Sequence, residues 1–206
     1  LWRQFDHPNV VPFLGVDRQT FEARYAIVTP WMENGNMLEY IRRQELPFYR
    51  ILLLITKLEE AARGLHYLHE HEFVHGDLRA ANVLIDDCGH ACLTDFGLTF
   101  VDHIASSNGS STTAHGNARW LPLEMLNGSQ DRPQCSTDVF SFGRVMLEAS
   151  PEYMYRRNLI WNEVERPTVD GVPSQAVPDW LWNLMLWCWE PDPMARPMAY
   201  DVLIRL

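Results

Sequence analysis

The sequence lacks a hydrophobic run long enough to cross a membrane. Apolar stretches such as residues 51–55 are far shorter than the about 20 residues that a transmembrane helix needs. Residues 1–4, Leu-Trp-Arg-Gln, also lack the charged and then apolar order of a secretory signal. We therefore expect no membrane insertion within this chain. Because the first residue is not Met, we also expect the natural N-terminus to be missing.

Basic residues are few as well: 17 Lys and Arg stand against 27 Asp and Glu, which gives a net charge of −10 at pH 7. Nucleic acids and anionic membranes attract proteins mainly through positive surface charge. A chain this acidic is therefore expected to have no nucleic-acid partner, although a single basic pocket can still bind phosphate. With 47% hydrophobic and 21% charged residues, the composition is that of an ordinary globular domain.

Cysteine is scarce, and no pair has the C-x-x-C spacing of a metal or redox site. The four cysteines are Cys88, Cys92, Cys135 and Cys188. Free thiols in a reducing compartment are the simplest interpretation, so we expect a cytoplasmic chain. Histidines at positions 69, 71 and 75 lie close together in the sequence, but no cysteine or carboxylate completes a metal site with them.

The apolar pattern predicts mostly helices. Apolar residues recur every three or four positions after Pro47, which predicts one long helix that ends near residues 69–71. Residues 102–118 are rich in Ser, Thr, Asn and Gly and are expected to form a loop. The other predicted elements are a buried strand at residues 25–29, a turn at 33–36, a hairpin of 83–85 with 91–94, and helices at 138–149, 178–189 and 197–206.

Polar residues with a specific spacing follow the predicted long helix. The loop of residues 75–82, His-Gly-Asp-Leu-Arg-Ala-Ala-Asn, carries Asp77, Arg79 and Asn82. The predicted hairpin then returns Asp95 to the same region. Phosphoryl transfer from ATP needs a carboxylate that accepts the hydroxyl proton, oxygen ligands that hold Mg²⁺, and a cation near the transferred group. These four residues supply each of those functions.

This loop, followed by Thr-Asp-Phe-Gly at residues 94–97, resembles the catalytic loop and the Mg²⁺-binding motif of protein kinases. On this resemblance Asp77 is the catalytic base, and Arg79 contacts the γ-phosphate. Asn82 and Asp95 hold Mg²⁺. The resemblance therefore implies ATP and Mg²⁺ as cofactors and a protein as the substrate.

Further segments resemble kinase landmarks in the order that the family has them: residues 7–11, 26–32, 116–124, 138–143 and 189–197. The second of these resembles the fifth strand of the small lobe and the hinge. It implies Thr29 as the gatekeeper and Met32 as the residue whose backbone meets the adenine edge. Pro30 and Leu84 are implied as further nucleotide contacts.

The resemblance covers nearly the whole chain and implies an α+β, protein-kinase-like fold. Residues 33–206 would form the mainly helical large lobe, and residues 1–32 a remnant of the small-lobe sheet with the hinge. In the family, the arginine of the closing motif pairs with a glutamate of the activation segment, which implies a largely buried ion pair between Arg196 and Glu124. The implied activity is ATP-dependent phosphorylation of protein Ser or Thr, with Tyr as the alternative, in the tyrosine-kinase-like branch.

Departures from the family pattern keep other interpretations open. The Gly-rich phosphate loop, the strand lysine and its partner glutamate are absent from the 206 residues. Gly76 replaces the arginine that usually precedes the catalytic Asp, and the stretch after Glu148 is short. We therefore expect the chain to be inactive by itself, and a pseudokinase scaffold or a truncated gene product is an alternative. The Ser and Thr of residues 106–113 are interpreted as a flexible loop rather than as phosphosites.

Overall fold

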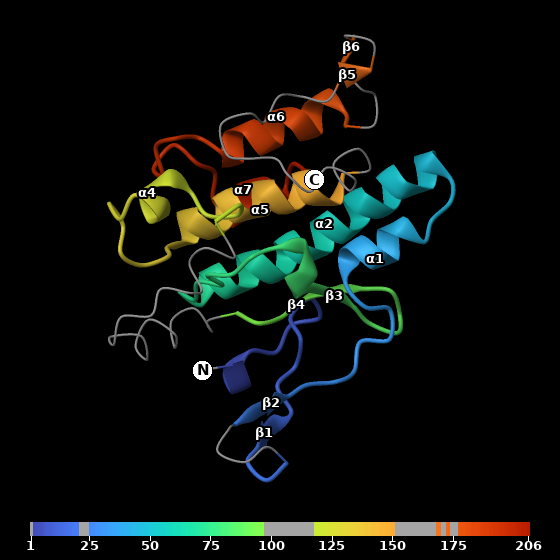
Figure 1. Ribbon diagram of the computed structural model, residues 1–206, viewed down its shortest axis with the longest axis vertical. Helices are drawn as coiled ribbons and strands as arrows, with labels where there is room; N and C mark the ends of the chain where they lie inside the picture. Colours follow the sequence, from blue (N-terminus) through green and yellow to red (C-terminus); the bar gives the residue numbers. More distant parts are fainter. Residues whose placement is uncertain (1, 21–24, 97–117, 151–167, 170–171, 174–176) are drawn as a thin grey trace.

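The computed structural model describes residues 2–20, 25–96, 118–150, 168–169, 172–173 and 177–206. Most of the described secondary structure is helical, and the strands are short (Figure 1). The helices are α1 (Met37–Arg42), α2 (Pro47–Glu70), α4 (Leu123–Leu126), α5 (Cys135–Ala149), α6 (Asp179–Cys188) and α7 (Ala199–Leu203), with 3-10 turns η1 (Trp2–Gln4) and η2 (Ala80–Asn82). The strands are β1 (Gly15–Asp17), β2 (Ala26–Val28), β3 (Val83–Ile85), β4 (Ala91–Leu93), β5 (Thr168–Val169) and β6 (Val172–Pro173). None of the described helices is long and apolar enough to cross a membrane.

Helix α2 has the length and the apolar stripe that its sequence predicts. Pro47 stands in its first turn, where the missing N–H leaves no hydrogen bond unmade. Leu54, Leu58 and Leu65 of the stripe are buried, and the helix packs mainly against α7 and β4. The helix ends with His71 as its C-cap, so both its extent and its end are confirmed.

Helices α5 and α6 pack closely against each other. Helix α5 begins with a capping box between Gln134 and Thr137, which satisfies backbone N–H groups at its first turn. A Cβ atom at Gly143 would lie 2.5 Å from Trp189 Nε1 and 2.9 Å from Cys188 Cβ. Only glycine therefore allows this approach. The predicted helices in these regions are confirmed, although α5 begins somewhat earlier than predicted.

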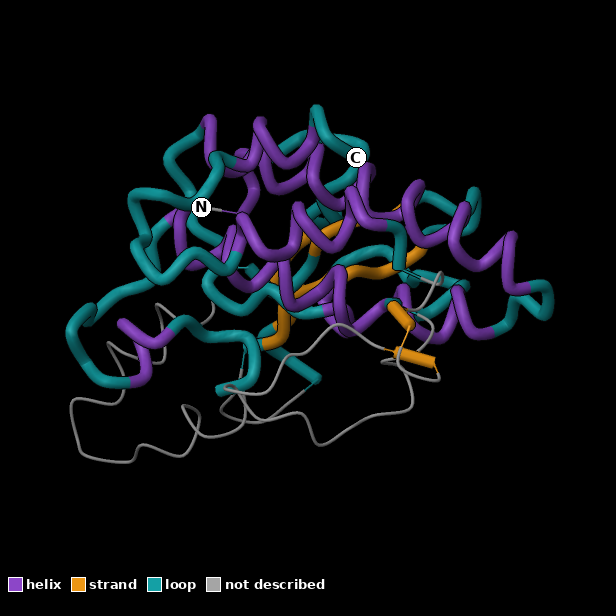
Figure 2. The backbone as a smooth tube through the Cα atoms, turned by 90° about the horizontal axis from the view of Figure 1, so that it is seen from above, coloured by secondary structure: helices purple, strands orange, loops and turns teal. Residues whose placement is uncertain are grey.

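The described strands form two-stranded antiparallel ladders. Strand β3 pairs with β4 in the register Val83 to Leu93 and Ile85 to Ala91, which confirms the predicted hairpin. An isolated parallel bridge joins Val10 to Leu93, so the N-terminal segment lies against β4. In the perpendicular view of Figure 2 the strands appear as short pieces beneath and beside the helices.

The predicted strand at residues 25–29 is present but is not buried. In β2, Ile27 and Val28 are 42% and 40% exposed. In the described part of the chain β1 is its only strand partner, and Figure 1 shows this hairpin at the end of the molecule away from the helices. The expectation of burial is therefore wrong, because an apolar run does not show whether a second layer covers the strand. The predicted loop at residues 102–118 lies, except for its last residue, outside the described residues.

Candidate active site

One carboxylate at the start of α5 holds the loop of residues 75–82. Asp138, which is 1% exposed, accepts hydrogen bonds from the backbone N–H of His75 at 2.7 Å and of Gly76 at 2.8 Å. Gly76 has a φ of 78°, a left-handed conformation that glycine adopts without strain. A side chain from a distant helix therefore fixes the backbone of this loop.

Two histidines near Asp138 have opposite protonation at neutral pH. His69 Nε2 lies 2.9 Å from Asp138 Oδ2. Burial lowers the pKa of His69, but hydrogen bonds with Asp138 and Cys135 outweigh this effect and raise the pKa to about 9. Burial lowers the pKa of His75 to about 4, so its imidazole is neutral. The carboxylate beside His69 was not predicted, because Asp138 is distant in the sequence.

The side chains of Asp77, Arg79 and Asn82 converge within the loop. Asn82 Nδ2 donates to the carbonyl oxygen of Asp77 at 2.8 Å and to its Oδ2 at 3.0 Å. Arg79 Nε lies 3.7 Å from the same Oδ2. Burial raises the pKa of Asp77, the Arg79 charge and the Asn82 hydrogen bond oppose this rise, and Asp95 adds to it. An oriented carboxylate with a raised pKa is a group suited to proton transfer.

Asp95 lies two residues after the end of β4, and main-chain contacts bring it to this loop. The N–H of Thr94 donates to the carbonyl oxygen of Asn82 at 3.0 Å. Phe96, on the other side of Asp95, is buried, and its ring centroid lies 4.3 Å from that of Trp2. Asp95 itself has a φ of 57° and an exposed side chain. The hairpin and the aromatic contact thus place Asp95 one residue beyond a direct contact with Asn82.

Two of the four residues expected to contact a nucleotide line one cavity of the described structure. Pro30 and Met32 line an open cavity of about 560 Å³, and its lining residues include neither Thr29 nor Leu84. Leu84 is half-buried on β3, and its antiparallel bridge to Asn36 connects it to the turn after Met32. Thr29 is half-buried at the end of β2. The structure therefore links Leu84 with the segment that follows Met32.

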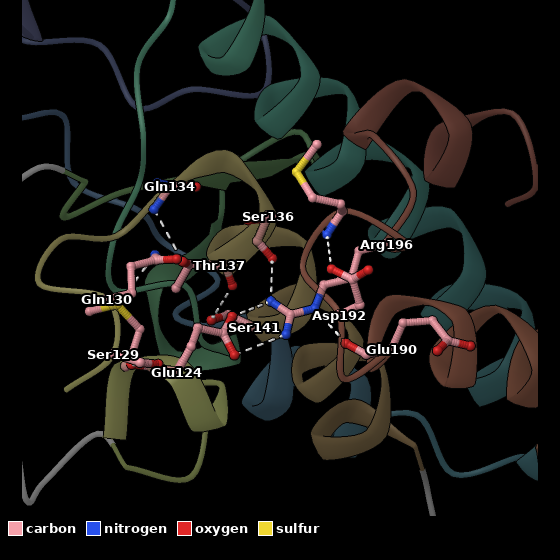
Figure 3. Close-up of polar contacts among 12 residues, drawn as sticks. Glu124, Ser129, Gln130, Gln134, Ser136, Thr137, Ser141, Glu190, Asp192 and Arg196 are labelled. Atoms are coloured by element: carbon pink, nitrogen blue, oxygen red, sulfur yellow. Dashed lines mark hydrogen bonds and ion pairs between the residues drawn. The ribbon is translucent and has the colours of Figure 1, made fainter. Parts of the chain in front are cut away.

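The predicted ion pair between Glu124 and Arg196 is confirmed (Figure 3). Arg196 donates from Nη1 to Glu124 Oε1 at 2.6 Å and from Nη2 to Oε2 at 3.1 Å, with side chains 1% and 13% exposed. The guanidinium also donates to the carbonyl oxygens of Glu190 at 2.8 Å and Ser136 at 3.2 Å. The two parallel bonds use the planar fork that only arginine offers. The pair joins α4 to the segment after α6 and to the start of α5.

A second carboxylate of α5 also supports the loop, and sequence reasoning missed it. Glu148 Oε2 accepts hydrogen bonds at 3.0 Å from the backbone N–H of Ala80 and from Trp120 Nε1. Burial raises the pKa of Glu148, while these two hydrogen bonds oppose the rise. One signal was visible in the sequence: Glu148 interrupts an apolar helix end, where a charge needs buried partners.

Known proteins are similar in sequence to this chain over nearly its whole length. A sequence model described as protein tyrosine and serine/threonine kinase matches residues 1–206. The chain is 32% identical over 213 residues to ephrin type-B receptor 5 and 30% identical over 204 residues to ephrin type-B receptor 2, both of Gallus gallus; the alignments cover 98% and 94% of this chain. It is 27% identical over 209 residues, 97% of this chain, to a protein of Acanthamoeba polyphaga mimivirus named as a serine/threonine-protein kinase/receptor.

These alignments cover 20% of each ephrin receptor and 13% of the viral protein, so the chain spans a fifth of the length of these relatives or less. The family match extends over every segment that carries the site, from the hinge-like residues 26–32 to the closing residues 189–197. The chain therefore belongs to the protein tyrosine and serine/threonine kinase family.

Proposed function

We propose that the chain is part of an ATP-dependent protein kinase that transfers the γ-phosphate to serine or threonine hydroxyls of proteins, with tyrosine as the alternative acceptor. The observation that supports this most is the contact of Asn82 with Asp77 beside Arg79, in a chain of the kinase family. The names of the relatives include both ephrin receptors and a serine/threonine-protein kinase/receptor, so they leave the acceptor open.

In the proposed mechanism Asp77 accepts the proton of the acceptor hydroxyl. The hydrogen bond from Asn82 to Asp77 Oδ2 at 3.0 Å fixes the orientation of the carboxylate. Burial raises the pKa of Asp77, which makes it a stronger base than an exposed aspartate. Arg79, with its Nε 3.7 Å from the same oxygen, places a positive charge where the γ-phosphate would lie.

The residues proposed to hold Mg²⁺ fit the chemistry of that ion, which prefers carboxylate and amide oxygens. Asn82 uses its amide nitrogen for both contacts with Asp77, so its Oδ1 is the atom offered to a cation. Asp95 offers an exposed carboxylate. It follows Thr94, whose N–H donates to the carbonyl oxygen of Asn82. When bound, Mg²⁺ would neutralise charge on the phosphates of ATP.

We also propose that residues 1–32 are the small-lobe remnant and hinge, and that residues 33–206 are the large lobe. The position of the β1–β2 hairpin at the far end from the helices supports this division (Figure 1). On this proposal Thr29, Pro30 and Met32 contact the adenine from the hinge. The cytoplasmic location expected from the free thiols stays a prediction.

Leu84 is proposed to contact the adenine from the large-lobe side. Its bridge to Asn36 supports this role, as does the hydrogen bond from the N–H of Ile85 to the carbonyl oxygen of Gly35 at 2.8 Å. Both contacts place β3 beside the turn that follows the hinge residues. A ring bound between the two segments would therefore meet the half-buried Leu84 side chain.

A non-catalytic pseudokinase scaffold is the second candidate. Gly76 in place of the family's arginine favours it. The retained Asp77, Asn82 and Asp95 favour catalysis, because a scaffold has no chemical need for all three.

The test separates nucleotide binding from transfer. ATP binding to the chain is measured by titration calorimetry with Mg²⁺ and with a chelator, and transfer is measured in the natural protein that carries the chain. Asp77→Asn should abolish transfer and leave ATP binding unchanged, whereas Asp95→Asn should weaken binding only when Mg²⁺ is present. Asp131 is exposed, and Asp131→Asn is the control, which should change neither ATP binding nor transfer.

Equal ATP affinity with and without Mg²⁺ contradicts the metal assignments. Binding of ATP without transfer in the natural protein selects the pseudokinase.

A further inference from the structure

The turn between β3 and β4 brings together three side chains that can ligate a metal ion. Asp86, Cys88 and His90 each offer one ligand atom, and these atoms all lie within 4.8 Å of one another. The residues alternate along the turn with the spacing Asp-x-Cys-x-His, which a search for paired cysteines does not detect. The proposed phosphoryl transfer uses none of them. We propose that this turn is a binding site for a divalent transition-metal cation of the zinc type.

The backbone of the turn holds the ligands in place before any metal binds. The N–H of Asp86 donates to the carbonyl oxygen of His90 at 3.0 Å, and the N–H of His90 donates to Asp86 Oδ1 at 2.7 Å. The N–H of Gly89 donates to the carbonyl oxygen of Asp86 at 3.1 Å. These bonds fold the turn so that residue 90 faces residue 86. Only side-chain torsions then remain to be adjusted on binding.

The distances between the ligand atoms fit tetrahedral coordination of a metal ion. Asp86 Oδ2 and His90 Nδ1 lie 3.5 Å apart. Zinc binds oxygen and nitrogen at about 2.0–2.2 Å, so two of its ligand atoms at a tetrahedral angle lie about 3.3–3.5 Å apart. The Cys88 sulfur is within 4.8 Å of one ligand atom of Asp86 and one of His90, and its exposed side chain can rotate closer. The three residues supply three ligands, and water can fill the fourth position.

The ligand types select the metal. Thiolate and imidazole suit zinc and its neighbours in the transition series, whereas Mg²⁺ and Ca²⁺ prefer oxygen ligands alone. The neighbouring carboxylates of Asp86 and Asp87 add negative charge around the exposed Cys88 side chain. This negative charge attracts a divalent cation, and binding of the metal releases the thiol proton. This turn is thus chemically distinct from the oxygen ligands proposed for Mg²⁺.

The turn is anchored to two other parts of the fold. Lys57 Nζ of α2 donates to the carbonyl oxygen of Gly89, and it also pairs with Glu60 at 2.7 Å. Asn34 Nδ2 donates to the carbonyl oxygen of Asp86 at 2.6 Å. A metal ion in the turn would therefore stiffen a hairpin that is bonded both to α2 and to the turn after Met32.

Titration of the whole chain with Zn²⁺ and with Co²⁺, under a phosphine reductant and without nucleotide, tests the site. One equivalent of Zn²⁺ should bind, and Co²⁺ should give a thiolate-to-metal charge-transfer band in the near ultraviolet. Cys88→Ser should remove this band, and Cys88→Ser and His90→Ala should each weaken Zn²⁺ binding at least about tenfold. Asp86→Asn keeps an oxygen for the His90 N–H and should also weaken binding.

Two controls make the result specific. Cys135→Ser, at a half-buried thiol away from the turn, should bind Zn²⁺ as the unchanged chain does. A tenfold excess of Mg²⁺ should not displace the zinc. The proposal is overturned if Cys88→Ser and His90→Ala bind Zn²⁺ as well as the unchanged chain, if Cys135→Ser abolishes the charge-transfer band, or if Mg²⁺ competes. Because no nucleotide is used, these outcomes are independent of the proposed kinase activity.

Discussion

Arg196→Ala is expected to destabilise the fold severely, because it leaves the carboxylate of Glu124 without its charged partner. Glu124 would keep its charge at a site that is 13% exposed and would lose both guanidinium contacts, of 2.6 and 3.1 Å. Breaking a buried pair by removing one partner costs about 3–5 kcal/mol. The carbonyl oxygens of Glu190 and Ser136 would lose a donor as well. Against a total stability of about 5–15 kcal/mol, this loss is a large fraction.

Urea unfolding and thermal melting measure the effect. For a domain of this size, each kcal/mol shifts the melting temperature by roughly 2–4 °C, so Arg196→Ala should lower it by about 6–20 °C. Arg196→Lys should restore only part of the loss, because one ammonium cannot form the two parallel bonds. The exposed pair of Arg63 with Glu59, whose side chains are 51% and 38% exposed, is the matched control. Arg63→Ala should cost less than about 1 kcal/mol. Equal effects of the two alanine variants would refute the reasoning from burial.

Other substitutions test the contacts of α5. The folded-state pKa of His69, about 9, is above its ordinary value of 6.5, so its stabilisation is complete below about pH 6.5 and is lost as the pH rises towards 9. Urea midpoints measured across this range should fall for the unchanged chain and stay flatter for His69→Gln. Gly143→Ala should cost about 1–3 kcal/mol in urea unfolding, because its Cβ would lie 2.5 Å from Trp189 Nε1; an unchanged midpoint would show that α6 can shift. Glu148→Ala should cost about 1–3 kcal/mol for each of the two donors it leaves unpaired, and Glu148→Gln should cost less.

Much of the fold could be predicted because its signals are local. The stripe of α2 and the proline at its start lie within one continuous stretch, and the β3–β4 hairpin is bounded by its own turn residues. Whether a strand is covered is not a local property. Ile27 and Val28 have the composition of a buried strand, yet they are exposed because no second layer covers them in the described part of the chain.

The same distinction between local and non-local signals applies to the candidate site. The short spacing of Asp77, Arg79 and Asn82 already places them on one loop, so their convergence could be predicted. Asp138 and Glu148 lie 63 and 68 positions from the backbone amides of His75 and Ala80 whose hydrogen bonds they accept, and the sequence around each carboxylate does not identify these donors. The ion pair of Arg196 was foreseen only through the family pattern, since its partner is 72 positions away.

The dependence of the loop on Asp138 has a consequence for protein synthesis. The backbone amide of His75 and the carboxylate that holds it are 63 positions apart, so residues 75–82 leave the ribosome well before α5 exists. Until then the carboxylate that accepts hydrogen bonds from the His75 and Gly76 amides is missing. A nascent chain that stopped before α5 would carry Asp77 and Asn82 in its sequence but would lack the carboxylates that hold the backbone amides of His75, Gly76 and Ala80.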